Sequence, residues 1–220
     1  MKLDITAIKN KITFYQEAGK RMFLTSSFQT HSIPLLHIIS QIDNSIPIYY
    51  LNTGFLFPET ISFKDELQEL LNMPMIGLTS GVTKINQMDS EGKLLYSSDP
   101  DYCCFLNKTQ PMEPILASHD IWINGIRADQ SAVRKNMKEE QPSKFGCTRY
   151  HPILNWDAKM IHAYRKEYNL PAHPLEKDGY LSIGCAPCTR KYIDTADERN
   201  GRWYGLNKTE CGLHTDLATK

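Results

Sequence analysis

Four of the six cysteines lie in two short motifs, the pair Cys103-Cys104 and the Cys185-x-x-Cys188 motif. This spacing is typical of metal ligands, and thiolates favour zinc or iron–sulfur clusters. Asp99-Pro100 predicts the N-cap and first residue of a helix, so the adjacent cysteines should diverge by about 100° around its axis. Diverging thiolates reach two irons of a [4Fe–4S] cluster more easily than one zinc ion. The motifs therefore favour the cluster, with zinc, a redox disulfide and plain buried thiols as alternatives.

A fifth cysteine, Cys211, has the surroundings of a nucleophile. It lies beside Gly212, three residues from His214 and close in sequence to several cations. The thiolate is the reactive form of cysteine, and positive neighbours lower its pKa. Cys211 is therefore the candidate nucleophile, and an exposed thiol without a role is the alternative. Cys147 has no such surroundings, so we expect it to be incidental.

The charge balance limits the class of partner. The chain of 220 residues carries 25 Lys and Arg against 25 Asp and Glu, which argues against a general nucleic-acid or membrane surface. The sequence has no apolar run long enough to span a bilayer and begins no signal-peptide pattern, so we expect a cytoplasmic protein with reduced cysteines. Basic residues can still gather locally. The candidates for neutralising an anionic substrate are Lys108, Arg127, Arg134, Arg199 and Arg202.

Strands alternating with helices predict an α/β fold with a mostly parallel sheet flanked by helices. Apolar runs at 22–24, 46–51, 75–78 and 121–126 are the expected strands, and the segments between them include amphipathic or capped helices. Ligands of such sheets bind at the carboxyl ends of the strands. We therefore expect the site at that edge.

Polar loops at these strand ends predict a nucleotide site. The hydroxyl-rich loop 25–32 leads from the first strand into a helix with Pro34 in its first turn. Its hydroxyls, its backbone N–H groups and the helix dipole suit an anion, although the Gly-Lys of a Walker loop is missing. The residues expected to face the ligand from the strand ends are Ser26, Ser27, Phe28, Thr53, Gly54 and Arg127.

The second half of the chain is expected to be less regular. The charged segment 135–144 has no apolar period and predicts a solvated loop. An edge strand is expected over 150–156, and Asp157 should cap a helix that ends near residue 168. The last segment has no helix or strand period. We therefore expect an α/β domain over 1–194 and a flexible C-terminal tail over 195–220.

Five motifs occur in the order found in one enzyme family. They are Cys103-Cys104, Gly125-Ile126-Arg127-x-Asp129-Gln130-Ser131, Cys185-x-x-Cys188, Arg199-x-x-Arg202 and Glu210-Cys211-Gly212-Leu213-His214. On these motifs, the chain from about residue 20 to the tail resembles the assimilatory adenylyl-sulfate/phosphoadenylyl-sulfate reductases. The resemblance implies an adenine nucleotide α-hydrolase-like fold, a [4Fe–4S] cluster and reduction of activated sulfate to sulfite in sulfate assimilation.

The resemblance also implies roles for individual residues. Cys211 would attack the sulfate sulfur, expel the nucleotide and become an S-sulfocysteine, with His214 near it. Lys108 looks like the lysine that lies between cluster and substrate in the family. The cluster would be held by Cys103, Cys104, Cys185 and Cys188, and the phosphosulfate by Arg127, Arg199 and Arg202.

Three residues depart from the family pattern. Asn52 stands where aspartate is common, Ala128 replaces a second arginine, and Tyr204 replaces a tryptophan. These departures leave the positioning of the substrate open. No thioredoxin-like domain follows Cys211 in this sequence, so an external dithiol protein such as thioredoxin is the implied reductant, and a homo-oligomer is usual among relatives.

Two activated sulfates are possible substrates. Within the family that this chain resembles, the cysteine pair and the Cys-x-x-Cys motif go mostly with adenylyl sulfate, whereas the serine-rich loop 25–29 looks like that of the phosphoadenylyl enzymes. A 3′-phosphate ordinarily calls for arginine or lysine, and loop 25–32 offers only His31, so we favour adenylyl sulfate. An ATP-dependent enzyme of the same fold would need glycines that this loop lacks. A non-catalytic iron–sulfur sensor would not need Cys211 or the arginine pair.

Overall fold

The chain folds around a six-stranded sheet with the strand order β3-β2-β1-β4-β6-β5. A computed structural model describes residues 3–191, 201–203, 205, 208, 210–214 and 217. In this part of the chain the pairs are parallel except β5–β6 at one edge. The strands are β1 (Met22–Thr25), β2 (Ile48–Leu51), β3 (Met75–Leu78), β4 (Ile121–Asn124), β5 (Glu140–Pro142) and β6 (Thr148–Tyr150). The helices are α1 (Thr6–Glu17), α2 (Ile33–Ile42), α3 (Pro58–Leu71), α4 (Leu95–Ser98), α5 (Pro100–Cys104), α6 (Gln110–Ser118), α7 (Ala132–Lys135) and α8 (Ala158–Glu167).

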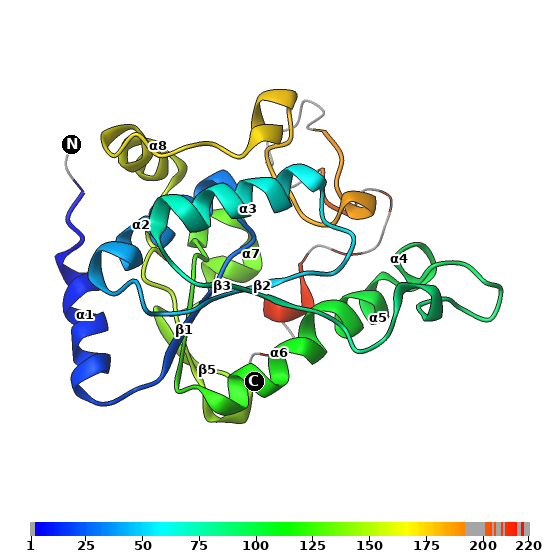
Figure 1. The fold of residues 1–220 in the computed structure, drawn as a ribbon, viewed down its shortest axis with the longest axis horizontal. Coiled ribbons are helices and arrows are strands. Elements are labelled where there is room, and N and C mark those ends of the chain that lie inside the picture. The colour runs from blue at the N-terminus through cyan, green and yellow to red at the C-terminus, as the bar shows by residue number, and fades with distance from the viewer. Residues whose placement is uncertain are drawn as a thin grey trace.

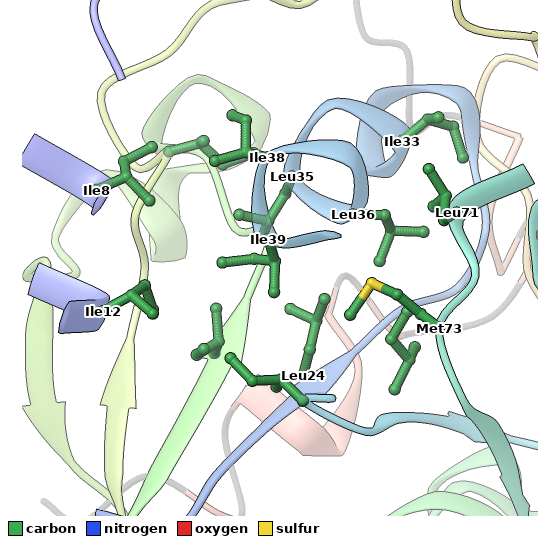
Figure 2. Packing of buried hydrophobic residues seen from close by; sticks show 14 of the residues in the cluster. Ile8, Ile12, Leu24, Ile33, Leu35, Leu36, Ile38, Ile39, Leu71 and Met73 are labelled. Carbon is green, nitrogen blue, oxygen red and sulfur yellow. The ribbon is translucent and has the colours of Figure 1, made fainter. Parts of the chain in front are cut away.

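Side-chain alternation in the central strands divides the core into two layers. Leu24 and Ile123 belong to the layer built with α1, α2, α3 and α8, whereas Phe23 and Trp122 pack with residues of α6 (Figure 1). Figure 2 shows the first layer, with Leu24 of β1 below Ile39 of α2. Because helices cover both faces, a ligand reaches the sheet at its strand ends.

The predicted α/β architecture and its first four strands are confirmed. Helix α2 follows β1 with Pro34 in its first turn, and its buried apolar residues give it a wide contact with the sheet. Helix α8 begins where predicted, since the Asp157 carboxylate accepts a hydrogen bond of 2.8 Å from the backbone N–H of Met160. None of the described helices combines the length and apolar composition needed to cross a membrane.

Two predictions about the sheet edge are wrong. The segment predicted as a solvated loop contains β5, which pairs with β6, and β6 ends at Tyr150 instead of running over 150–156. Arg149 made β6 hard to predict, because a charged residue is not expected in an internal strand. Its guanidinium is buried 4.7 Å from the centre of the Trp122 ring. Pro152 has no N–H for a ladder, and the chain turns after Tyr150. At the edge itself, Glu140 of β5 forms a 2.6 Å salt bridge with Lys11.

The buried His151 beside this hairpin predicts a loss of stability in mild acid. Burial lowers its pKa to about 4, with Arg149 and Arg134 also lowering it, although the hydrogen bond to the Lys138 carbonyl raises it. The folded state therefore favours neutral His151, so its contribution is complete above pH 6.5 and is lost as the pH falls towards 4. The loss is on the order of 3 kcal/mol. Urea unfolding at pH 7 and pH 4 should show it, and His151→Gln should flatten the dependence. An unchanged pH dependence of the unfolding free energy in His151→Gln would contradict this.

Several of the described residues of the C-terminal tail pack against the domain. Trp203 is 3% exposed and Leu217 is fully buried beside α6. Gly212–His214 forms a 3₁₀ turn (red in Figure 1) that contacts the segment Phe105–Thr109. These contacts bring the end of the sequence next to the cysteine-pair helix. The division of the chain at residue 194 stays a prediction.

Candidate active site

A cavity of about 180 Å³ lies at the carboxyl ends of β1, β2 and β4, as expected for a parallel sheet. Its walls come from the hydroxyl-rich loop, the segment after α5, the Cys-x-x-Cys motif and the tail. The structure therefore brings together segments far apart in the sequence. The predicted site residues that line this cavity are Ser26, Ser27, Phe28, Thr53, Lys108, Arg134, Cys185, Arg202 and Cys211.

The hydroxyl-rich loop is shaped by its own hydrogen bonds. The Ser26 hydroxyl accepts a bond of 3.0 Å from the N–H of Phe28, which has a positive φ of 57°. The Ser27 hydroxyl accepts from the Gln29 amide, whose oxygen accepts from the N–H of Ile183 at 2.9 Å. Gln29 thus ties this loop to the Cys-x-x-Cys segment. The Phe28 ring is buried, so it packs in the core as well as lining the cavity.

The cysteine-pair helix forms as predicted and continues into a π-helical turn. The Asp99 carboxylate caps α5 by accepting from the N–H of Tyr102 at 2.9 Å. The π-helical turn Phe105–Thr109 follows, and Pro111 explains it in part because proline has no N–H for the α-helical bond to the Asn107 carbonyl. This turn, which the sequence analysis missed, holds Lys108 at the cavity.

Four thiols gather from the helix and the Cys-x-x-Cys motif. Burial, together with the nearby thiols of Cys104, Cys185 and Cys188, raises the pKa of Cys103 to about 11. The Cys185 sulfur lies 3.3 Å from the Thr53 hydroxyl. Within the described residues, no group of three or more His, Cys, Asp or Glu side chains is placed to hold a metal ion. The donor set fits a cluster in which each thiolate binds its own iron better than it fits one zinc ion.

Lys108 lies near these thiols and lines the same cavity as Cys211. Burial alone would lower its pKa, but Cys185, Cys211 and Cys104 outweigh burial and raise the pKa above its usual value. Lys108 therefore stays protonated. Lys208, which the sequence analysis missed, is a second cation near Cys104 and Cys211 and is paired with Asp101. The sequence feature that could have identified Lys208 is its position three residues before the candidate nucleophile Cys211.

The two described arginines predicted to bind the phosphosulfate differ in placement. Arg202 lines the cavity, stacks on Trp203 at 4.6 Å and donates to the Ile183 carbonyl at 3.1 Å. Gly184 leaves room for its guanidinium, which a Cβ there would meet. Arg127 is buried outside the cavity lining and bonds both carboxylate oxygens of Asp129, at 2.9 and 3.1 Å. Its contact with substrate stays a prediction.

The remaining predicted residues lie at the margin of the site or outside the described residues. Gly54 does not line the cavity, and its carbonyl accepts a hydrogen bond from Lys84. Arg199, Tyr204 and the side chain of His214 lie outside the described residues.

Cys211 is partly exposed at the cavity and is held through Glu210. The Glu210 carboxylate accepts from the backbone N–H of Cys211 at 3.1 Å and forms a salt bridge of 2.9 Å with Arg134. Arg134 appeared in the sequence only as one of several cations, and Glu210 only as part of a motif. The two residues are 76 positions apart, and neither sequence segment alone predicts that they form a pair.

Comparisons with known proteins identify the family of this chain. The family model described as phosphoadenosine phosphosulfate reductase domain matches residues 21–191. An adenosine 5'-phosphosulfate reductase of Streptomyces coelicolor is 36% identical over 212 residues, covering 96% of this chain and 89% of its own length. A phosphoadenosine 5'-phosphosulfate reductase of Gloeobacter violaceus is 37% identical over 202 residues, covering 89% of this chain and 83% of its own length.

Solved structures confirm the predicted fold. The phosphoadenylyl-sulfate reductase of Candida auris, solved as a phosphate complex, has a TM-score of 0.66 at 19% identity and covers 85% of this chain and 98% of its own. The FMN adenylyltransferase of Candida glabrata has a TM-score of 0.58 at 14% identity and covers 91% of this chain and 66% of its own. At these identities the likeness shows the fold alone.

Proposed function

Because the chain belongs to the phosphoadenosine phosphosulfate reductase domain family, we propose that it reduces adenylyl sulfate to sulfite and AMP through an S-sulfocysteine on Cys211. One observation carries the proposal: Cys211, Lys108 and Arg202 line the same cavity as the hydroxyl-rich loop. A thiol nucleophile, two cations and a nucleotide-binding strand edge are the groups that the reaction needs.

The first step is attack by the Cys211 thiolate on the sulfate sulfur. A sulfur–sulfur bond forms, the bond from sulfur to the bridging oxygen breaks, and its electron pair leaves on the phosphate of AMP. Thiolate and substrate are both anionic, so fixed cations in a partly desolvated site must offset their repulsion. Lys108 and Arg202 are placed for this role, and a cation near the bridging oxygen helps the transition state specifically because that oxygen gains charge.

The second step needs an external dithiol, for which we propose thioredoxin or a similar protein. One of its thiolates attacks the Cys211 sulfur and releases sulfite, and its second thiol resolves the mixed disulfide. The dithiol is oxidised to a disulfide and so supplies the two electrons. Partial exposure of Cys211 is compatible with this attack.

The four gathered thiols support a [4Fe–4S] cluster as the cofactor. Cys103, Cys104, Cys185 and Cys188 would each hold one iron. When bound, the cluster would order the two segments that carry its ligands and polarise the charge around Lys108. The buried Lys108 ammonium, which lies near three of the thiols that the reaction or the cluster uses, would compensate part of the negative charge.

Lys108→Met is expected to lower kcat/KM about 100- to 1,000-fold, the range typical of losing one preorganised electrostatic contact. Methionine keeps the volume and removes the charge near Cys185, Cys104 and Cys211. The measurement is steady-state sulfite release, with iron content recorded alongside. Lys93→Met, a change at an exposed lysine paired with Glu91, is the matched control. Activity of Lys108→Met within threefold of wild type would exclude the proposed role.

Adenylyl sulfate is the proposed substrate because the cavity offers no cation from the hydroxyl-rich loop beyond His31. We expect kcat/KM for adenylyl sulfate to exceed that for the 3′-phosphorylated nucleotide at least tenfold, or about 1.4 kcal/mol in transition-state binding. Sulfite release with each nucleotide, with and without thioredoxin, tests both the function and the choice. A tenfold preference for the phosphorylated nucleotide would reverse the choice, and no sulfite from either would defeat the function.

A further inference from the structure

We propose that Glu210, neutralised by Arg134, is a positioning residue that fixes Cys211 at the cavity. The inference rests on the proposed function, since it concerns the nucleophile of that reaction. Both side chains are almost fully buried, with 8% of Arg134 and 4% of Glu210 exposed. Neither was assigned a role by the motifs.

The contacts of Glu210 join the nucleophile to the end of the sheet. One carboxylate oxygen accepts from the backbone N–H of Cys211 at 3.1 Å and from Arg134 Nη2 at 2.9 Å. The other accepts from Arg134 Nε at 3.0 Å and from the Ser131 hydroxyl at 3.2 Å. Ser131 is the N-cap of α7, and Arg134 lies within that helix, ten residues after the end of β4 at Asn124. The carboxylate therefore links the backbone of Cys211 to the segment that follows a central strand.

The charges explain why the carboxylate needs Arg134. An anion next to a thiolate nucleophile and an anionic substrate would oppose the reaction. The fork of Arg134 bonds both oxygens, so the pair adds a rigid anchor without adding net charge. A third guanidinium nitrogen donates to the Gln130 amide oxygen. Arg134 is thus engaged by Glu210 and Gln130, which argues against its being a general phosphosulfate cation despite its place in the cavity wall.

This arrangement predicts opposite changes of KM for the two partners. Glu210→Gln keeps one acceptor oxygen but replaces the other with an NH2 group that cannot accept these hydrogen bonds, so it weakens the anchor and leaves the Arg134 cation uncompensated beside an anionic substrate. The rate of Cys211 sulfonation should fall about 10- to 100-fold, as expected for a misplaced nucleophile, while KM stays equal or falls. Arg134→Gln leaves the carboxylate uncompensated, so kcat should fall and KM should rise. The double variant should recover at least fivefold in kcat/KM over Arg134→Gln, because the two residues are coupled.

The experiment measures single-turnover sulfonation of Cys211 and steady-state kinetics on the iron-loaded protein with adenylyl sulfate. Glu140→Gln, which breaks the Lys11 salt bridge at the sheet edge, is the matched carboxylate control and should react as wild type. If Glu210→Gln does not fold, Ser131→Ala removes one bond to the carboxylate together with the N-cap bond to the Arg134 N–H, and it should slow sulfonation three- to tenfold.

Two results would overturn the inference. One is sulfonation of Cys211 by Glu210→Gln, or by Ser131→Ala if that variant is needed, at a rate within twofold of wild type. The other is a rise of KM in both Glu210→Gln and Arg134→Gln without recovery in the double variant, the pattern of a merely structural ion pair. A wild-type protein that never sulfonates Cys211 would instead refute the proposed function, so the two failures are distinguishable.

Discussion

Cys211→Ser is expected to abolish sulfite release, with a loss of at least about 1,000-fold, while iron content and nucleotide binding stay unchanged. The serine hydroxyl is protonated at neutral pH and is a far poorer nucleophile than a thiolate. The exchange removes one sulfur atom at the cavity edge and leaves the contact between the Cys211 N–H and Glu210 in place. Steady-state sulfite release and titration of AMP binding check the two halves of this prediction.

Cys147→Ser is the matched control. Burial raises the pKa of Cys147 to about 12, and its side chain packs with Phe23 and Trp122 under α6, away from the cavity lining. A thiol in that position is neither ionised nor accessible, so the variant should retain activity. Sulfite release that survives Cys211→Ser and disappears in Cys147→Ser would exchange the roles of the two residues.

Cys185→Ser is expected to remove most of the iron and to destabilise the fold. Wild-type protein should hold about four irons and four sulfides per chain. Cys185 connects the Thr53 loop, through its sulfur and an isolated bridge to Leu56, to the segment that carries Cys188. Without this ligand the cluster should be lost, and the buried thiols of Cys103 and Cys104 would no longer be linked to the Cys185-x-x-Cys188 segment through it.

Iron and labile-sulfide assays, the visible absorbance of the cluster and thermal unfolding measure the effect of Cys185→Ser, with Cys147→Ser as the cysteine control. A wild-type protein with one zinc per chain and no labile sulfide would contradict the cluster. Full iron retention in Cys185→Ser would remove Cys185 from the ligand set while leaving the cluster itself possible.

The parts of the fold that depend on local chemistry were predictable from the sequence. Apolar runs located β1 to β4, and Asp99 and Asp157 marked helix starts because their carboxylates cap backbone N–H groups. The carboxyl-end rule then placed the cavity, since parallel strands present their polar loops at one edge. Nearly all the predicted residues that line the cavity followed from these local signals or from the motifs.

The features that depend on long-range pairing were not predictable in this way. Arg149 reads as a surface residue, yet its guanidinium is buried over Trp122 in an internal strand. Arg127 reads as a free cation, yet Asp129 bonds its guanidinium twice. Glu210 reads as one residue of a motif, yet its carboxylate is buried in a salt bridge with Arg134. Each case turns on the partner that a charge finds in three dimensions, which residue type and spacing do not specify.

The most direct test of the central claim is the mass of Cys211 after reaction with adenylyl sulfate in the absence of any reductant. Peptide mapping of the anaerobically purified protein should find one sulfo group on the peptide that contains Cys211, and adding thioredoxin should remove it with release of sulfite. A sulfo group on Cys147, or no sulfo group on any cysteine while sulfite is still produced, would contradict the account.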